Sequence, residues 1–203
     1  MAADYIITIN RQFGSMGGPI AKKLSERLGI DYFDREIVDK AAKQLNMQIS
    51  EISELEESAK GLLISKRYPL GMGTTEVQDK IFKEQKKLIL NFADRGNCIV
   101  VGRCADDILK DHPNLLRIFI FAPKQERIRM CTRYYQMPEE EARRMVSEVD
   151  KAREMYHKKY TGYLPGDPKF MNLAVDSSVL GVDATVDLLE EYVRRYKAQK
   201  NLE

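Results

Sequence analysis

Short apolar segments that alternate with helical patterns constrain the fold of this chain more than any other feature. Residues 5–9, 30–33, 98–102, 116–122 and 171–176 are short and rich in β-favouring side chains. Helical patterns lie between them, and strands connected in this way pair in parallel, with the helices covering both faces of the sheet. The sequence therefore predicts an α/β fold, a layered sandwich built on a parallel, five-stranded sheet.

The end of the first strand carries the clearest ligand-binding pattern. The segment Asn10-Arg-Gln-Phe-Gly-Ser-Met-Gly-Gly18 joins this strand to a helical pattern. Glycines at such a turn let backbone N–H groups approach a phosphate at the positive end of the helix. We therefore expect phosphate contacts from Gly14, Ser15, Met16, Gly17 and Gly18.

This loop differs from the P-loop motif G-x-x-x-x-G-K-[ST]. That motif supplies a lysine for the β- and γ-phosphates and a hydroxyl for Mg²⁺, and Gly17 and Gly18 stand about where these residues would fall. On glycine spacing alone, a tight turn without a ligand fits nearly as well. The position in the first βα turn favours phosphate, with Arg11 and Ser15 as substitute cation and hydroxyl.

Charged side chains also follow the second and third strands. Arg103 comes directly after the third strand, where a guanidinium can form two hydrogen bonds to a phosphate. Asp106 could orient Mg²⁺ or a sugar hydroxyl, or simply interact with a helix dipole. After the second strand, Arg35 could reach an acceptor phosphate, whereas Asp34 could also be an N-cap. Ligands are expected to gather where these strand ends meet.

Two helical segments on either side of Pro138 are rich in positive charge. Phosphoryl transfer requires dense positive charge and exclusion of water, which a helical lid over about residues 127–165 would supply. Most of this charge is expected to be solvated and paired with glutamates such as Glu139 and Glu148, so only a few arginines should act. The basic residues are Arg127, Arg129, Arg133, Arg143, Arg144, Arg153, Lys158 and Lys159.

Composition and charge exclude several classes of protein. The 203 residues carry 33 basic and 31 acidic side chains, a near balance that gives no general attraction to nucleic acid or to a membrane. The three cysteines lack metal-binding spacing and suit free thiols in a reducing cytosol. Because no segment has the features of a cleavable leader or a membrane span, we expect a cytoplasmic protein without a metal centre. Nothing in the sequence indicates its oligomeric state.

Taken together, these segments resemble the cytidylate kinase-like family. The resemblance also includes Glu148, Asp150 and Arg153, runs through nearly the whole chain and is fairly specific as a set. Its motifs are Ile-Thr-Ile-Asn-Arg-Gln-Phe-Gly-Ser at 7–15, Tyr-Phe-Asp-Arg-Glu-Ile-Val at 32–38, Ile-Val-Val-Gly-Arg at 99–103, Arg-Ile-Phe-Ile-Phe-Ala-Pro-Lys-Gln-Glu-Arg-Ile at 117–128 and Leu-Ala-Val-Asp-Ser-Ser at 173–178.

The resemblance implies a P-loop kinase-like three-layer sandwich and a phosphotransferase that moves the γ-phosphoryl group of Mg·ATP to a nucleoside monophosphate. A single domain over residues 1–203 would carry an acceptor-side helical insert at about 35–95 and the lid at about 127–165. CMP or dCMP is the first candidate acceptor. Because the P-loop lysine is absent, two alternatives stay open: a non-catalytic nucleotide-binding module and a kinase for another small phosphate acceptor.

The resemblance also assigns expected roles to individual residues. ATP phosphates would lie over the glycine loop, with Mg²⁺ bridging their oxygens, and the acceptor phosphate near Arg35 and Arg103. The lid arginines would be Arg129, Arg133 and Arg153. The residue patterns above add Arg11 as a catalytic cation and Asp34 and Asp106 on the substrate side.

Overall fold

A five-stranded parallel sheet forms the centre of the computed structural model, which describes residues 4–45 and 75–202. The order β2-β3-β1-β4-β5 places the first strand in the middle, and every neighbouring pair is parallel. The parallel sheet predicted from the sequence is therefore confirmed. The strands are β1 (Ile6–Arg11), β2 (Asp31–Phe33), β3 (Cys98–Val101), β4 (Leu115–Phe121) and β5 (Leu173–Asp176).

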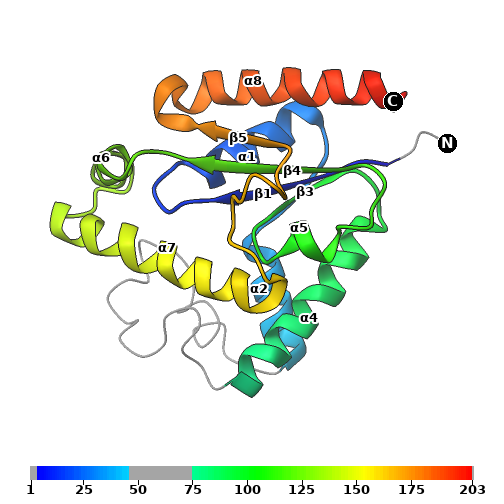
Figure 1. Ribbon diagram of the computed structural model, residues 1–203, viewed down its shortest axis with the longest axis horizontal. Coiled ribbons are helices and arrows are strands. Elements are labelled where there is room, and N and C mark those ends of the chain that lie inside the picture. The colour runs from blue at the N-terminus through cyan, green and yellow to red at the C-terminus, as the bar shows by residue number, and fades with distance from the viewer. Residues whose placement is uncertain (1–3, 46–74, 203) are drawn as a thin grey trace.

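Helices cover both faces of this sheet, so the three-layer sandwich is also confirmed. Figure 1 shows α1 and α8 on one face, and α2, α4, α5 and α7 on the opposite side. The helices are α1 (Gly17–Leu28), α2 (Arg35–Leu45), α4 (Thr75–Ala93), α5 (Ala105–Ile108), α6 (Lys124–Tyr134), α7 (Glu139–Thr161) and α8 (Ser177–Lys200). Among the described helices, none has the length and apolar character needed to cross a lipid bilayer.

Alternation along the central strand divides the core into two layers. Ile7 and Ile9 pack with α1 and α8, whereas Ile6 faces the layer formed by α2, α4 and α5. All of β3 is buried, as expected for a strand covered on both faces. This packing fixes the strand ends, where the candidate site residues lie.

Local signals set the ends of the helices. Gly29 adopts the left-handed conformation (φ 64°) that ends α1, and the Asp176 side chain accepts a hydrogen bond from the Ser178 N–H (2.9 Å) at the start of α8. The helical pattern in the sequence is clear only from residue 183, but α8 begins at Ser177. Its backbone is non-helical at Gly181 (φ 71°), which interrupts the pattern.

The predicted insert and lid correspond to identifiable helices. The insert range contains α2 and α4, which pack together under β3, and residues 46–74 of that range lie outside the described residues. The lid range contains most of α6 and all of α7, which share a small core with Phe13 of the glycine loop. The division into insert and lid stays a prediction.

Candidate active site

An open pocket of about 100 Å³ lies where β1 ends and α1 begins. It combines the first turn of α1 with the ends of β1 and β2, and α7 contributes one arginine. The strand ends therefore meet as the parallel topology predicts. The lining residues are Arg11, Gln12, Phe13, Gly17, Gly18, Pro19, Asp34, Tyr135 and Arg153.

The first turn of α1 gives this pocket an anion-binding end. Met16 stands before the helix in a left-handed conformation (φ 59°), and Gly17 and Gly18 open its first turn. The N–H groups of a first helical turn have no partner within the helix and carry its positive partial charge. A Cβ on Gly18 would have no heavy atom within 4 Å, so the backbone is open to a ligand at this point.

Three other residues of the loop face the protein interior: Ser15 and Met16 with their side chains, and Gly14 with its backbone. The Ser15 hydroxyl is buried and lies within hydrogen-bond distance of the carbonyls of Gln12 (2.9 Å) and Ile120 (3.1 Å). Met16 belongs to the core, and a Cβ on Gly14 would stand 2.8 Å from the Arg127 carbonyl oxygen. The Ser15 hydroxyl thus faces the protein, its expected role as the substitute for the P-loop hydroxyl stays a prediction, and Gly14 is required for packing.

Compared with the P-loop motif, the cationic residue and a glycine have changed places in this chain, at Arg11 and Gly17. If the motif lysine falls at position 17, its first glycine falls at position 11, where this chain has arginine. A Cβ on Gly17 would stand only 2.6 Å from the Arg11 Cβ. The side chain of Arg11 thus fills the space that a side chain at position 17 would need.

The Arg11 guanidinium extends from this point toward the ends of β2 and β3. Its Nη2 lies 3.3 Å from Asp34 Oδ1, and a Cβ on Gly102 would overlap its Nη1. Asp34 also accepts a hydrogen bond from the Tyr32 hydroxyl (3.1 Å). The Asp34 carboxylate is therefore an ion-pair partner of Arg11 at the pocket wall.

Two further arginines join Arg11 and Asp34. Arg153 of α7 donates from Nη1 to the Arg11 carbonyl (2.8 Å). Arg103 lies in a run of left-handed residues, Gly102 (φ 70°), Arg103 (φ 57°) and Cys104 (φ 56°), that turns the chain after β3. Strained backbone of this kind is held by its surroundings and occurs often at functional sites. We call Arg11, Asp34, Arg103 and Arg153 the arginine cluster.

Among the described residues, the arginine cluster brings three guanidinium groups and one carboxylate together. Burial lowers the pKa of Arg103 to about 10 and holds the pKa of Arg153 well below its ordinary value. The charge of Arg11 lowers both pKa values further, whereas Asp34 raises them. Guanidinium groups gathered in this way can form charge-assisted hydrogen bonds to a phosphate.

Two of the predicted lid arginines lie elsewhere. Arg129 is exposed on α6 and pairs with Glu126 (2.6 Å), while Arg133 is exposed beside the Tyr134 ring. Neither lines the pocket, so the structure brings only Arg153 of the three to the cluster. Arg35 begins α2, and its side chain lies outside the part of the chain that the structure describes.

Asp106 is used within the protein and is not open to a substrate. Only 1% of it is exposed, and both carboxylate oxygens lie 3.1 Å from His157 Nε2. The Tyr163 hydroxyl donates to the same carboxylate (2.8 Å). The structure does not bring Asp106 to the pocket, and its expected role in substrate binding stays a prediction. No sequence pattern predicted this contact, and the one available hint is that His157 lies one helical turn after Arg153.

Arg127 joins the glycine loop to α6 and α7. Its guanidinium donates to the carbonyls of Ala122 (2.9 Å) and Phe13 (3.0 Å) and pairs with Asp150. Asp150 also accepts the Phe13 N–H (2.8 Å). This buried arginine therefore has a structural role, whereas Arg144 forms an exposed ion pair with Glu148, as expected for the basic helices.

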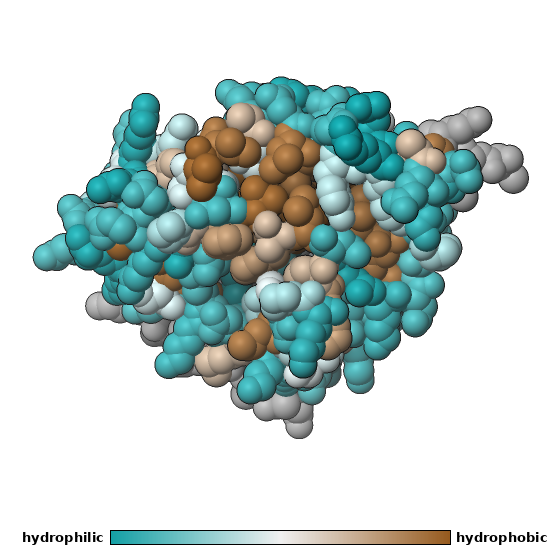
Figure 2. All heavy atoms as spheres, turned by 45° about the horizontal axis from the view of Figure 1, so that its top comes forward, coloured by the Kyte–Doolittle hydropathy of each residue, from teal (hydrophilic) through white to brown (hydrophobic). Residues whose placement is uncertain are grey.

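Apolar side chains lie beside the end of β5. Val179 and Leu180 follow the Asp176 cap and are 75% and 46% exposed. Figure 2 shows hydrophobic side chains gathered on the face that α8 borders. Because parallel strands end at one edge of the sheet, these residues lie on the same edge as the arginine cluster.

The described residues contain no group of three or more histidine, cysteine, aspartate or glutamate side chains that could hold a metal ion. Asp34 is the acidic residue of the pocket lining.

Comparisons with known proteins find relatives of this sequence. The sequence profile described as the cytidylate kinase-like family matches residues 6–179. A cytidylate kinase from Aeropyrum pernix is 25% identical over 183 residues, which cover 90% of this chain and 95% of that protein.

Solved structures show the same fold. An uncharacterized protein from Eubacterium ventriosum is similar with a TM-score of 0.71 and 26% identity, over 94% of this chain and 98% of that one. Shikimate kinase from Bacteroides thetaiotaomicron has a TM-score of 0.58 at 10% identity, over 95% of this chain and 99% of that one. The second likeness shows the fold alone.

Proposed function

Because the chain belongs to the cytidylate kinase-like family, we propose that it moves the γ-phosphoryl group of Mg·ATP to a nucleoside monophosphate, with CMP or dCMP as the first candidate. The arginine cluster beside the first turn of α1 carries this proposal. Phosphoryl transfer depends on positioning and on positive charge around the transferred group, and this site offers both.

The proposed arrangement assigns each substrate to one side of the arginine cluster. The ATP phosphates bind at the backbone of Gly17 and Gly18, and the base packs against Val179 and Leu180. The acceptor phosphate binds between Arg103 and Arg153, and Arg11 lies between the two phosphates. Mg²⁺ enters as part of Mg·ATP, and Asp34 is the lining residue that would face it.

In the proposed reaction, an oxygen of the acceptor phosphate attacks the γ-phosphorus in line. A bond forms between this oxygen and the γ-phosphorus, and the bond to the β–γ bridging oxygen breaks, with its electron pair leaving on ADP. The negative charge on the transferred group is stabilised by Arg11 in place of the P-loop lysine, and by Arg153.

The first test is a coupled assay of ADP release from Mg·ATP with CMP, dCMP, UMP, AMP and GMP offered separately. Arg153→Ala should lower kcat/KM by about 100-fold or more because it removes a cation from the transferred phosphate. Arg144→Ala is the matched control, since Arg144 lies on the same helix in an exposed ion pair with Glu148. If nucleotides bind in calorimetry but no acceptor gives turnover, a non-catalytic nucleotide-binding protein or a kinase for another small phosphate acceptor replaces this proposal.

An exchange of residues tests the role of Arg11 directly. Gly17→Lys alone should impair folding and turnover because its Cβ would stand 2.6 Å from the Arg11 Cβ. The double variant Arg11→Gly, Gly17→Lys frees that space and returns the cation to the P-loop position, so activity should recover relative to either single variant. A fully active Gly17→Lys single variant would contradict the proposed exchange.

A further inference from the structure

We infer that His157 and Asp106 form a protonation-dependent tie that positions Arg153 against Arg103, so that anion binding at the arginine cluster weakens when His157 loses its proton. This inference rests on the proposed function of that cluster. His157 and Asp106 touch no substrate in this scheme and act as positioning residues.

The tie joins the two elements that carry these arginines. Arg153 and His157 lie one turn apart on α7, which places them on the same face of the helix. Asp106 lies in α5, directly after the left-handed turn that carries Arg103. A contact between His157 and Asp106 therefore sets the separation of the two arginine-bearing segments.

Both nitrogens of the His157 ring face oxygen atoms. Nε2 lies 3.1 Å from each Asp106 carboxylate oxygen, and Nδ1 lies 3.0 Å from the Tyr163 carbonyl and 3.0 Å from the Thr161 hydroxyl oxygen. The Thr161 hydroxyl lies within hydrogen-bond distance of the His157 carbonyl (2.9 Å), which leaves its oxygen able to accept from the ring. An imidazolium donates from both nitrogens, so this environment fits the charged form of His157.

The surrounding charges favour the same form. Burial lowers the pKa of His157, but the hydrogen bond and the charge of Asp106 outweigh it, and Asp107 adds to them, so the net shift is upward. Burial raises the pKa of Asp106, but His157, Asn10 and Tyr163 lower it overall. The pKa of the Tyr163 hydroxyl is raised by its own burial and by Asp106, so it stays a neutral donor.

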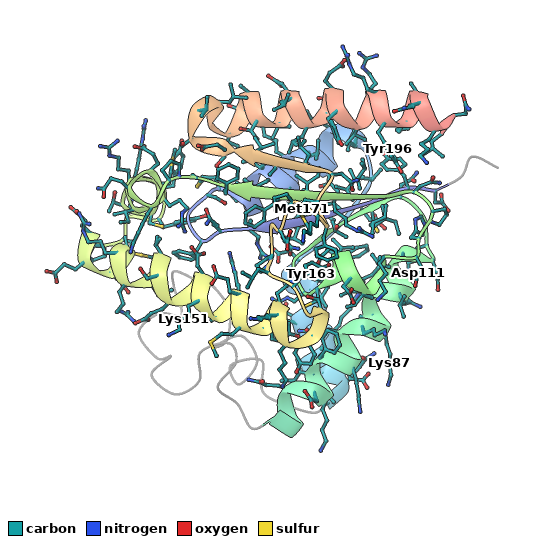
Figure 3. The ribbon with its side chains drawn as sticks, in the orientation of Figure 1. Lys87, Asp111, Lys151, Tyr163, Met171 and Tyr196 are labelled. Carbon is teal, nitrogen blue, oxygen red and sulfur yellow. The ribbon has the colours of Figure 1, made fainter. Side chains whose placement is uncertain are left out.

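Tyr163, in the segment after α7, contacts both His157 and Asp106. Figure 3 labels Tyr163 near the carboxyl end of α7, beside α5. Its carbonyl accepts from His157 and its hydroxyl donates to Asp106, so one residue contacts both members of the pair. Movement of Asp106 away from His157 would therefore disturb the end of α7 as well.

Loss of the proton weakens these contacts. A neutral imidazole can still donate from Nε2 to Asp106 while Nδ1 accepts from the Thr161 hydroxyl, but the attraction between the imidazolium and the carboxylate and the ring's hydrogen bond to the Tyr163 carbonyl are lost. Because the folded pKa of His157 is raised, the stabilisation that the charged pair gives is complete below the unfolded pKa of about 6.5 and is lost as the pH rises through the folded pKa. Arg153 is then held less firmly at the Arg11 carbonyl.

Sulfate binding tests the tie because sulfate remains a dianion across the pH range, unlike phosphate or ATP. Sulfate affinity should fall by about tenfold as His157 loses its proton, within the range of ordinary coupling between sites. The chain has two histidines, so NMR can follow the His157 ring in the same samples. The midpoints of ring titration and sulfate binding should coincide in the unmodified protein.

Variants complete the test. His157→Gln and Asp106→Asn should abolish the pH step in sulfate binding and in KM, while His112→Gln, which removes the other histidine, should keep it. A step that persists in a folded His157→Gln variant, or a ring titration with a different midpoint in the unmodified protein, would overturn the inference.

The inference and the proposed function fail in different ways. If sulfate binds with the expected pH step but no acceptor supports turnover, the kinase proposal fails and the tie stands. If sulfate does not bind at all, the Arg153 Nε–H resonance still reports on the tie, and it should shift with the His157 titration. If the Arg153 resonance does not shift as His157 titrates, this result alone would overturn the inference.

Discussion

Gly14 and Gly18 belong to the same loop but are needed for different physical reasons. Gly14 has a positive φ of 77°, and a Cβ there would stand 2.8 Å from the Arg127 carbonyl oxygen and 2.9 Å from Cys131 Sγ. A Cβ on Gly18 would meet no heavy atom within 4 Å. At the scale of single residues, Gly14 therefore permits packing of the loop on α6, whereas Gly18 leaves room for a ligand.

Gly14→Ala should destabilise the protein by about 2 kcal/mol or more, because a non-glycine residue in the left-handed region costs about 1–2 kcal/mol before any overlap is relieved. Gly18→Ala should leave the free energy of unfolding nearly unchanged and should weaken ATP binding. Urea unfolding and calorimetry of both variants measure the two effects. Equal stability of the two variants would contradict this separation of roles.

At the scale of elements, Arg127 and Asp150 hold α6, α7 and the loop segment at Phe13 in one arrangement. Their side chains are only 7% and 15% exposed, and Phe13 bonds to both residues. Removing one member of a buried pair leaves the other charge without compensation. The two helices α6 and α7 are therefore anchored to the loop at Phe13, while the exposed ion pairs farther along them contribute little.

Arg127→Ala should lower the free energy of unfolding by about 3–5 kcal/mol, the usual loss when one member of a buried ion pair is removed. Arg129→Ala, on the same helix with the exposed partner Glu126, should change it by less than about 1 kcal/mol. Urea denaturation monitored by circular dichroism checks both values. Similar losses of unfolding free energy in the two variants would show that burial does not make the Arg127 ion pair more important for stability than the Arg129 pair.

At the scale of the whole molecule, the cysteines report on the integrity of the folded structure. Cys98, Cys104 and Cys131 are free and buried, and they come from β3, the turn before α5, and α6. Burial raises the pKa of Cys98 to about 12 and that of Cys131 to about 11, and it holds the pKa of Cys104 well above its ordinary value. Each thiol therefore needs an opening of its own region before it can react.

The three thiols should react with a disulfide reagent at pH 8 more than roughly 100-fold slower in the folded protein than in urea, because the thiolate is the reactive form. The reaction can be followed by absorbance, and peptide mapping identifies the thiols in order of reaction. Rapid reaction of Cys104 alone would show that the turn carrying Arg103 opens independently. Rapid reaction of all three would contradict the described core.

The order of strands and helices, the parallel sheet and the location of the site at the strand ends follow from the sequence, because they depend on local patterns and short connections. Only the tertiary structure decided which side chains meet. Arg153 donates a hydrogen bond to the carbonyl of Arg11, which lies 142 residues earlier in the sequence, while Arg129 and Arg133 are exposed to solvent. The local pattern is similar for all three arginines, and contacts with distant segments separate them.

The same reason applies to the side chains of Ser15 and Asp106. Both residues follow the end of a strand, as the sequence pattern indicates, but their side chains bond to Ile120 and His157, which come from later parts of the chain. A sequence pattern reports the backbone position of a polar group. The tertiary structure alone decides whether that group faces a ligand or another part of the protein, because its hydrogen-bond partners come from segments that are distant in sequence.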